Sequence, residues 1–170
     1  MLFKLNASKY SGVRYSEDET CFHFARSGQK DASDDDWSVN GAGHDFNHKY
    51  GHGALDAGLA VHIATNWTNV NPELNWTSGE KSISQTIPNN TPNGLSDTVL
   101  VNAGLLVETV EVRFDADHTY RGDIEVTLTS PDGTISRLSE KHTDNNNNYN
   151  EWVFSSVLHW DESSDGTWTI

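Results

Sequence analysis

The chain has 170 residues, with 11 Lys and Arg against 25 Asp and Glu, a formal net charge of −14 at pH 7 and a pI near 4.7. Phosphate backbones repel so acidic a protein and no basic patch offsets the charge, which argues against nucleic-acid binding. No apolar run approaches the roughly 18 residues of a membrane span. The single Cys21 excludes an internal disulfide framework, and no role is assigned to it.

The hydrophobic content of 35% favours disorder, but 6 Trp, 5 Tyr and 6 Phe favour a packed core. We therefore expect a folded, acidic, β-rich domain with one poorly packed end. The apolar stretch Met1–Leu5 is shorter than the about 7–15 apolar residues of a signal peptide. The absence of a signal peptide from this sequence indicates either a cytoplasmic protein or a fragment whose N-terminal part lies elsewhere.

The first 36 residues show no hydrophobic period and contain two charge clusters, which predicts an irregular surface arm over 1–36. Glycines then mark tight turns within 37–67. Asp56 is a favourable N-cap before the Ala-rich run Ala57–Ala64, which predicts one short helix.

Three prolines and many Asn and Ser indicate a linker over 68–98, in which alternation predicts one short strand at Lys81–Ile87. From residue 99 the pattern becomes β. Val110, Val112 and Phe114 fall on one face of a predicted strand.

The Ser130–Gly133 turn signal predicts a hairpin over 124–138. A polar loop is expected at His142–Asn150, and further strands begin at Trp152 and Trp168. Short strands separated by turns are typical of a sandwich or jelly roll.

Two groups of side chains are candidate metal ligands. His44, His48 and His52 would share one face of a helix and could bind zinc, but Gly51 and Gly53 argue against a helix there. Oxygen-rich loops suit calcium. The acidic candidates are Asp115, Asp117 and Asp123, with a second loop at Asp161, Glu162 and Asp165. A solvated acidic surface is the favoured alternative for both loops.

Two further patterns have competing interpretations. Arg121-Gly122-Asp123 is either an adhesion tripeptide or, as we favour, a tight turn in which Asp123 accepts backbone N–H bonds. Trp152, Trp160 and Trp168 are either a sugar-stacking platform or, more commonly for such aromatics, core residues within strands.

Two stretches resemble the subtilisin/kexin-type proprotein convertases. The segment at 40–61 is similar to the C-terminal end of that family's catalytic domain, and the segments at 119–138 and 150–168 are similar to its P domain. The residues that fit the first motif are Asn47, His48, Tyr50, Gly51, Gly53, Asp56, Ala57 and Trp67. Those that fit the second are Arg121, Gly122, Asp123, Ser130, Pro131, Gly133, Thr134, Trp152, Phe154, Trp160, Glu162, Gly166 and Trp168.

The resemblance implies a mainly β fold, a jelly-roll-like β-sandwich (the P domain) preceded by the terminal loop and helix of a subtilisin-like α/β catalytic domain. The implied organisation is an irregular arm at 1–36, a catalytic-domain remnant at 37–67, a linker with the first short strand at 68–98, and a C-terminally truncated P domain at 99–170. Unpaired edges of a truncated sandwich would favour self-association. The resemblance also makes His48 a structural residue near the domain junction.

By this resemblance the chain is the C-terminal portion of a kexin-like, calcium-dependent serine endopeptidase that cleaves after basic residues. The P domain would stabilise the catalytic domain in cis, and calcium would serve mainly that missing domain. No catalytic residue is assigned, because no Gly-Thr-Ser-x-Ala nucleophile motif is present and independent triad chemistry has no local signature. The chain alone should be inactive.

We expect the full-length protein to be secreted or held in the cell envelope. Two alternatives remain open: a free-standing β-sandwich that binds carbohydrate or a surface partner, and a gene fragment without a function.

Overall fold

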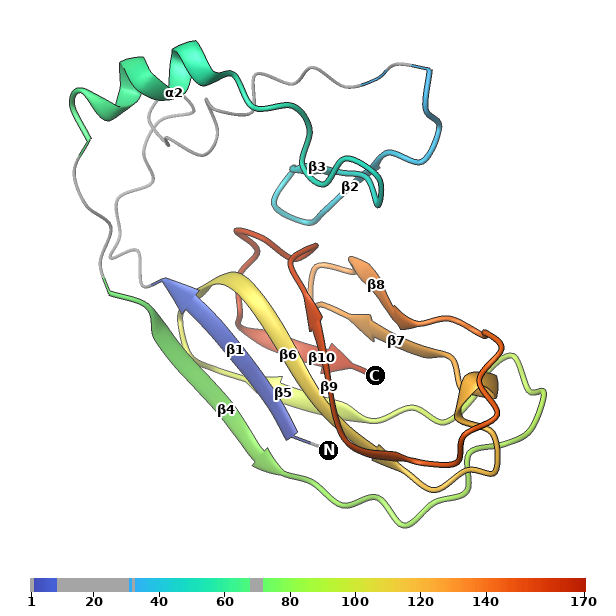
Figure 1. Ribbon diagram of the computed structural model, residues 1–170. Coiled ribbons are helices and arrows are strands. Elements are labelled where there is room, and N and C mark those ends of the chain that lie inside the picture. Colours follow the sequence, from blue (N-terminus) through green and yellow to red (C-terminus); the bar gives the residue numbers. More distant parts are fainter. Residues whose placement is uncertain (1, 9–30, 32, 68–71) are drawn as a thin grey trace.

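The computed structural model describes residues 2–8, 31, 33–67 and 72–170, and it is mainly β (Figure 1). This confirms the mainly β class expected from the sequence. The helices and strands are β1 (Leu2–Ser8), β2 (Ser38–Val39), β3 (Asp45–Phe46), α2 (Ala57–Ala64), β4 (Leu74–Glu80), β5 (Thr98–Val101), β6 (Leu106–Ala116), η1 (Arg121–Asp123), β7 (Val126–Thr129), β8 (Ile135–Ser139), β9 (Tyr149–Ser156) and β10 (Gly166–Thr169). None of the helices in this described part is long and apolar enough to cross a membrane.

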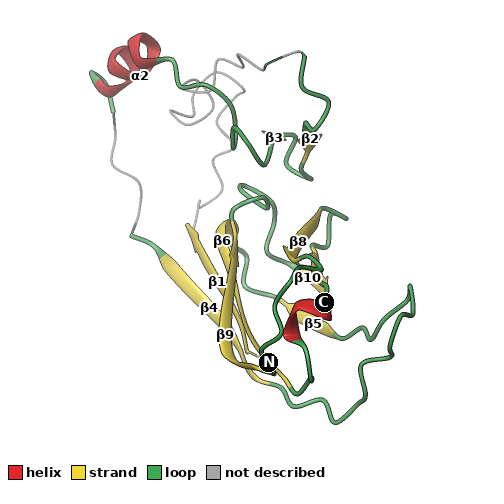
Figure 2. Ribbon diagram, turned by 45° about the vertical axis from the view of Figure 1, so that its right-hand side comes forward, coloured by secondary structure: helices red, strands yellow, loops and turns green. Residues whose placement is uncertain are grey.

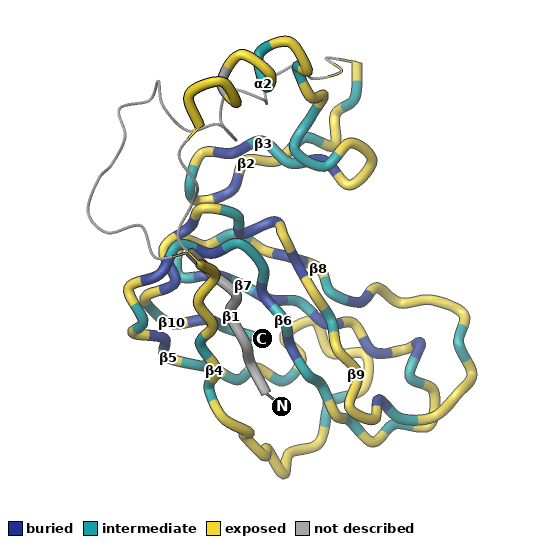
Figure 3. Tube along the Cα trace, turned by 60° about the vertical axis from the view of Figure 1, so that its left-hand side comes forward, coloured by how far each residue is buried: buried dark blue, intermediate teal, exposed yellow. Residues whose placement is uncertain are grey.

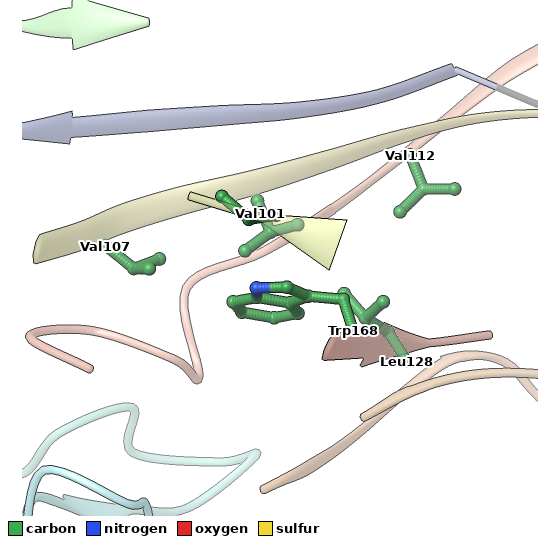
Figure 4. Close-up of a cluster of buried hydrophobic side chains, with 6 residues drawn as sticks. Val101, Val107, Val112, Leu128 and Trp168 are labelled. Carbon is green, nitrogen blue, oxygen red and sulfur yellow. The ribbon is translucent and has the colours of Figure 1, made fainter. Parts of the chain in front are cut away.

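Two four-stranded antiparallel sheets share one hydrophobic core. The strand orders are β4-β1-β6-β9 and β5-β10-β7-β8. Val107 and Val112 of β6 enter the core from the first sheet (Figure 4), and Val110 of the same strand is buried in the same cluster. The second sheet contributes Val101, Leu128 and Trp168, and all six residues are at most 1% exposed. Burial of this alternating apolar face stabilises the pairing of the two sheets.

The hairpin predicted at 124–138 is confirmed. β7 and β8 pair antiparallel, and the Gly133 N–H donates to the Ser130 carbonyl at 3.0 Å to close the turn. Gly133 has φ of +88°, a left-handed conformation that glycine adopts without steric cost. Ile124, Val126 and Leu128 are buried, as their alternation indicates.

The arm predicted at 1–36 is wrong for Leu2–Ser8, which form β1 inside a sheet. A strand partner distant in sequence overrides a weak local pattern here. Cys21 and most of the predicted arm lie outside the described residues.

The strand predicted at Lys81–Ile87 is also wrong, because the strand in this region is β4 and the segment after it has no regular structure. Leu2 of β1 pairs with Glu80, and no described strand lies opposite the following residues. The segment that contains Ile83 and Ile87 therefore has no described strand with which to form backbone hydrogen bonds, despite its alternating pattern.

Residues 33–67 lie at one end of the two sheets. β2 and β3 form a small hairpin near the sandwich, and α2 lies beyond it (Figures 2 and 3). α2 begins where the sequence predicts: the Leu59 N–H donates to Asp56 Oδ1 at 2.9 Å, which is an N-cap bond.

Candidate functional site

The loop of residues 40–44 is joined to the sandwich through buried polar contacts, and we call this contact the junction. Asn40 is 4% exposed, and its side-chain amide donates to the carbonyls of Leu158 and Trp160 at 2.9 and 2.8 Å. Its Oδ1 accepts from the His44 N–H at 2.8 Å, which folds the loop back on itself. Asn40 therefore satisfies loop and sandwich backbone groups together.

Glu162 forms the sandwich side of the junction and is 1% exposed. Its Oε1 accepts from the Gly41 N–H at 2.7 Å and from the Thr134 hydroxyl, and Oε2 lies 3.3 Å from His159 Nδ1. The Glu162 carbonyl also accepts from the Val107 N–H at 3.0 Å, which attaches this turn to β6. The carboxylate of Glu162 thus connects the loop to the β7–β8 turn, and the backbone carbonyl of Glu162 connects its own turn to the first sheet.

The Glu162 carboxylate stays ionised despite its burial. Burial raises the pKa of Glu162, but hydrogen bonds from His159, Thr134, Ser130 and the Gly41 N–H lower it, and the resulting pKa is about 2. At neutral pH the Glu162 carboxylate is therefore negatively charged and accepts hydrogen bonds from these groups. Such a group suits a structural connection better than proton transfer.

His159 is fully buried beside this anion, and its ring meets the Trp168 ring edge-on with 5.0 Å between centroids. Because ionised Glu162 only accepts, Nδ1 must carry the hydrogen that it shares with the carboxylate. Within the described residues Nε2 is buried and has no hydrogen-bond partner. His159 therefore connects the junction to the core residue Trp168.

Because it has no side chain, Gly41 allows the loop of residues 40–44 to approach the β7–β8 turn closely. A Cβ at Gly41 would overlap Cβ of Asp132 and lie 2.9 Å from its Cγ. On the other side of the loop, His44 is 4% exposed and its Nε2 lies 3.3 Å from Asp161 Oδ2. The sequence singled out His44 only as a candidate zinc ligand.

The predicted zinc ligands have different roles in the structure. His44 belongs to the junction, whereas His48 is exposed and meets Phe46 edge-on at 5.3 Å. Of these two histidines, His44 makes the contacts with Asn40 and Asp161 at the junction. His52 Nδ1 lies 2.9 Å from the Asp45 carbonyl.

The predicted calcium ligands Asp115, Asp117 and Asp123 do not converge. Asp115 accepts from the Glu151 N–H at 2.5 Å, and Asp123 lies 4.0 Å from Lys141 Nζ. No group of three or more His, Cys, Asp or Glu side chains in the described ranges is arranged to hold a metal ion. The calcium prediction at these residues has no support from the described part of the chain.

The second acidic loop is not simply a solvated surface, because Glu162 is buried. Asp165 is exposed, yet its Oδ1 accepts from the N–H groups of Ala103 and Gly104, each at 2.7 Å. The hydrogen bonds from the Gly104 and Ala103 N–H groups lower the pKa of Asp165 below its usual value, although burial opposes them. The sequence signal for Glu162 was its place two residues after Trp160 in the second motif.

Arg121-Gly122-Asp123 forms the short 3-10 helix η1, which confirms the tight turn. The backbone hydrogen bonds expected at the Asp123 side chain are not found among the described residues, where its contact is Lys141 Nζ at 4.0 Å. Arg121 Nε donates to Asp144 Oδ2 at 2.7 Å, and its guanidinium lies over the Trp152 ring, 5.1 Å from the centroid. An arginine held in this way is poorly placed for an adhesion contact.

We expect Gly122→Ala to destabilise the fold by about 2 kcal/mol, because a Cβ there would collide with backbone atoms. Its nearest contacts would be the His142 carbonyl oxygen and the Asp144 nitrogen, the latter at 2.7 Å. Urea unfolding of the purified chain measures the effect. The matched control is Gly58→Ala in α2, which should be neutral or stabilising; equal losses in both variants would contradict the expectation.

The three tryptophans of the second motif do not form a platform. Trp168 is core at 1% exposure, but Trp152 is 43% exposed and Trp160 lies in a turn rather than a strand. The core interpretation is therefore right for Trp168 and wrong for Trp152.

The first motif shapes the loop before α2. Gly51 and Gly53 have φ of +57° and +103°, which glycine adopts without steric cost. Tyr50 stacks on Trp37 with 6.0 Å between ring centroids, and Asp56 caps α2.

Comparison with known proteins agrees with the resemblance to the proprotein convertases and with its P-domain motif. Residues 107–170 match the family described as proprotein convertase P-domain. The chain is 34% identical over 151 residues to proprotein convertase subtilisin/kexin type 4 of Rattus norvegicus, covering 80% of this chain and 21% of that protein. It is 35% identical to protease KEX1 of Kluyveromyces lactis (81% and 19% covered) and 34% identical to furin of Mus musculus (80% and 18%).

Among solved structures, the chain is similar to the serine protease of Aeromonas sobria, with a TM-score of 0.63 and 26% identity. This match covers 78% of the chain and 25% of that protease. The same protease in complex with its chaperone ORF2 gives a TM-score of 0.61. The chain spans about a fifth of the length of the curated relatives that it matches.

Proposed function

We propose a supporting role for this chain, from the premise that it is homologous to the proprotein convertases over about 80% of its length and has that family's P domain at residues 107–170. In this proposal it is the C-terminal portion of a kexin-like, calcium-dependent serine endopeptidase. Its P domain stabilises the catalytic domain in cis, and the chain alone does not hydrolyse peptides.

The junction is the observation that carries this proposal. The loop at 40–44 belongs to the stretch that resembles the end of the catalytic domain, and Glu162 belongs to the P domain. Asn40 and Gly41 are bound to Leu158, Trp160 and Glu162 by bonds of 2.7–2.9 Å. Buried polar groups satisfied across a contact fix the relative position of its two sides.

The surface of α2 supports the same proposal. The helix contains no Asp, Glu, Lys or Arg, and the apolar side chains of Leu55, Val61 and Trp67 are 70%, 68% and 45% exposed. A short apolar helix is marginal in water unless packing covers it. The remainder of a catalytic domain would bury this surface.

Calcium belongs, in this proposal, to the catalytic region rather than to this chain, since Asp115, Asp117 and Asp123 do not form a ligand group. The full-length enzyme is secreted or held in the cell envelope and cleaves after basic residues. Its nucleophile, histidine and aspartate would come from outside this chain.

A chimaera tests the supporting role. The aligned region of Kluyveromyces lactis KEX1 is replaced by this chain, and hydrolysis of a dibasic fluorogenic peptide is followed during heating. We expect an active chimaera. We expect Asn40→Ala to shorten its half-life by about 5- to 100-fold, because the loss of buried hydrogen bonds costs about 1–3 kcal/mol and each 1.4 kcal/mol is about tenfold.

The matched control in the chimaera is Asn102→Ala, at an exposed position, which should leave the half-life unchanged. The kcat/KM of the surviving enzyme should stay the same in both variants. An Asn40→Ala chimaera as long-lived as the unaltered one would contradict the proposal, as would a chimaera that lacks residues 107–170 and survives heating equally well.

A further inference from the structure

Two Asn-Gly pairs occur in the sequence, Asn40-Gly41 and Asn93-Gly94, and they lie in different environments. Asn40 is 4% exposed at the junction, whereas Asn93 is exposed in a turn of the segment between β4 and β5. Asparagine is a thermolabile residue. It is most labile before glycine, because a glycine has no side chain to shield its backbone nitrogen. The same reactive pair is thus buried at one site and exposed at the other.

The reaction open to an Asn-Gly pair is deamidation. The glycine backbone nitrogen attacks Cγ of the asparagine side chain and forms an N–Cγ bond. The Cγ–Nδ2 bond breaks, and Nδ2 leaves as ammonia with the proton that the backbone nitrogen loses. The cyclic succinimide then takes up one water molecule and opens to aspartate or isoaspartate. Water is the only co-reactant.

The junction holds the side-chain amide of Asn40 on both of its polar atoms. Nδ2, the leaving group, donates to the carbonyls of Leu158 and Trp160 at 2.9 and 2.8 Å. Oδ1 accepts from the N–H groups of Ala42 and His44 at 3.1 and 2.8 Å. Attack requires Cγ to turn into line with the incoming nitrogen. These four bonds oppose that rotation and keep Nδ2 in place.

The attacking nitrogen is held as well. The Gly41 N–H donates to Thr134 Oγ1 at 2.8 Å and to Glu162 Oε1 at 2.7 Å. A negative charge that develops on this nitrogen as it loses its proton would be repelled by the ionised Glu162 carboxylate. Asn40 should therefore react from an opened junction, in which the amide and the nitrogen are both released.

Asn93-Gly94 has fewer restraints. Within the part of the chain that the structure describes, the Asn93 side chain makes no hydrogen bond, and the Gly94 N–H donates to the Thr91 carbonyl at 3.0 Å inside an exposed turn. The nearest acidic anchor of the Gly41 type is thus missing from this turn. Asn93 therefore serves as an internal reference for an unprotected pair in the same molecule.

We propose that Asn40-Gly41 is a deamidation site that the closed junction protects, and that deamidation after opening prevents the junction from closing again. An aspartate side chain replaces the donor Nδ2 with an oxygen that only accepts, so it would repel the carbonyls of Leu158 and Trp160. Isoaspartate also lengthens the backbone by one methylene group. The proposal holds whether or not the chain supports a catalytic domain.

Peptide mapping of the full chain tests the protection. The folded chain is kept in mildly alkaline buffer, digested with trypsin and analysed by mass spectrometry for both products. The two pairs fall on different tryptic peptides, 31–49 and 82–113. We expect Asn40 to react at least about tenfold more slowly than Asn93. Tenfold corresponds to about 1.4 kcal/mol, which several buried hydrogen bonds together can supply.

The same chain unfolded in urea is the control for local sequence. Both pairs are then open, and Asn40 and Asn93 should react at similar rates. Equal rates in the folded chain would overturn the proposal. An Asn40 that remains slower by the same factor in urea would also overturn it, because the protection would then come from neighbouring residues in the sequence rather than from the junction.

A substitution at the junction gives an independent measure. Thr134→Val keeps the shape of the side chain but removes one acceptor of the Gly41 N–H. It should accelerate the reaction of Asn40 about fivefold, as expected for the loss of one hydrogen bond, and leave Asn93 unchanged. The matched control is Thr127→Val in β7, half-buried like Thr134, which should alter neither rate. Equal effects of the two substitutions would contradict protection by the junction.

The effect of the product is tested with Asn40→Asp. Hydrogen exchange of the Gly41 N–H, which donates to Glu162 in the closed junction, should become at least about tenfold faster, because the junction stays open. Asn93→Asp adds the same charge at the exposed pair and should leave this exchange unchanged. A Gly41 N–H that exchanges equally in both variants would overturn the proposal, since deamidation would then leave the junction closed.

Discussion

Glu162→Ala should destabilise the chain by about 3–5 kcal/mol, the usual cost of breaking a buried charge network. The substitution removes the acceptor of the Gly41 N–H, the Thr134 hydroxyl and His159 Nδ1 at once. Each 1 kcal/mol corresponds to a shift of about 2–4 °C in the Tm of a protein of this size. Differential scanning calorimetry or urea unfolding at pH 7 measures the loss.

Glu140→Ala is the matched control for this substitution. Glu140 has a side chain that is 68% exposed and pairs with Arg137 at 2.9 Å, and surface pairs of this kind contribute about 0–1 kcal/mol. A Glu162→Ala variant as stable as Glu140→Ala would show that the junction does not hold the loop. Glu162→Gln keeps the shape and one acceptor, so its loss should fall between those of the two alanine variants.

The same carboxylate predicts acid sensitivity. The pKa of Glu162 is lowered from 4.5 in the unfolded chain to about 2 in the folded one, so the folded state favours the ionised form. The stabilisation is fully present above pH 4.5 and is lost as the pH falls towards 2. By linkage it amounts to roughly 3 kcal/mol.

Comparison of unfolding free energies from pH 7 down to pH 3 isolates this contribution. Other carboxylates with lowered pKa values, such as Asp144 and Asp165, lose stabilisation in the same direction. The informative quantity is therefore the difference between the unaltered chain and Glu162→Gln, which should shrink as the pH falls below 4.5. A difference that stays constant with pH would contradict the assignment.

Local patterns predicted the elements whose partners are close in the sequence. The β7–β8 hairpin needs only a turn at Ser130–Gly133 and two alternating segments, and α2 needs only its Asp56 cap. Val110 and Val112 were identified as core residues by period-two alternation alone. In each case the burial of one face is decided within a window of about ten residues.

Elements set by distant contacts were not predictable in this way. β1 is a strand because β4 and β6 flank it, and its own seven residues carry no distinctive alternation. Charge composition groups Glu162 with solvated acids, because it does not reveal that Gly41, more than a hundred residues earlier, donates a hydrogen bond to its carboxylate. The family motif was the one sequence feature that set Glu162 apart from its acidic neighbours.

Trp168→Ala should produce a loss as large as that of Glu162→Ala, about 3–5 kcal/mol, because it removes the largest side chain of the core. Trp168 is 1% exposed, and its indole N–H donates to the Ser164 carbonyl at 2.9 Å. Trp67→Ala is the control, since Trp67 is 45% exposed at the end of α2 and its loss should cost about 0.5 kcal/mol or less. Urea unfolding followed by circular dichroism measures both variants without relying on tryptophan fluorescence.

The losses of stability caused by Glu162→Ala and Trp168→Ala should also be coupled through His159. This residue contacts both the Glu162 carboxylate and the Trp168 ring. Once Trp168 is removed, the ring of His159 loses the surface that orients Nδ1 towards the carboxylate. The double variant should therefore cost less than the two single losses added together, by about 0.5–3 kcal/mol. If the two losses in unfolding free energy add exactly, Trp168 and Glu162 are not coupled energetically through His159. A measured coupling would instead make the position of the 40–44 loop depend on the packing between the two sheets.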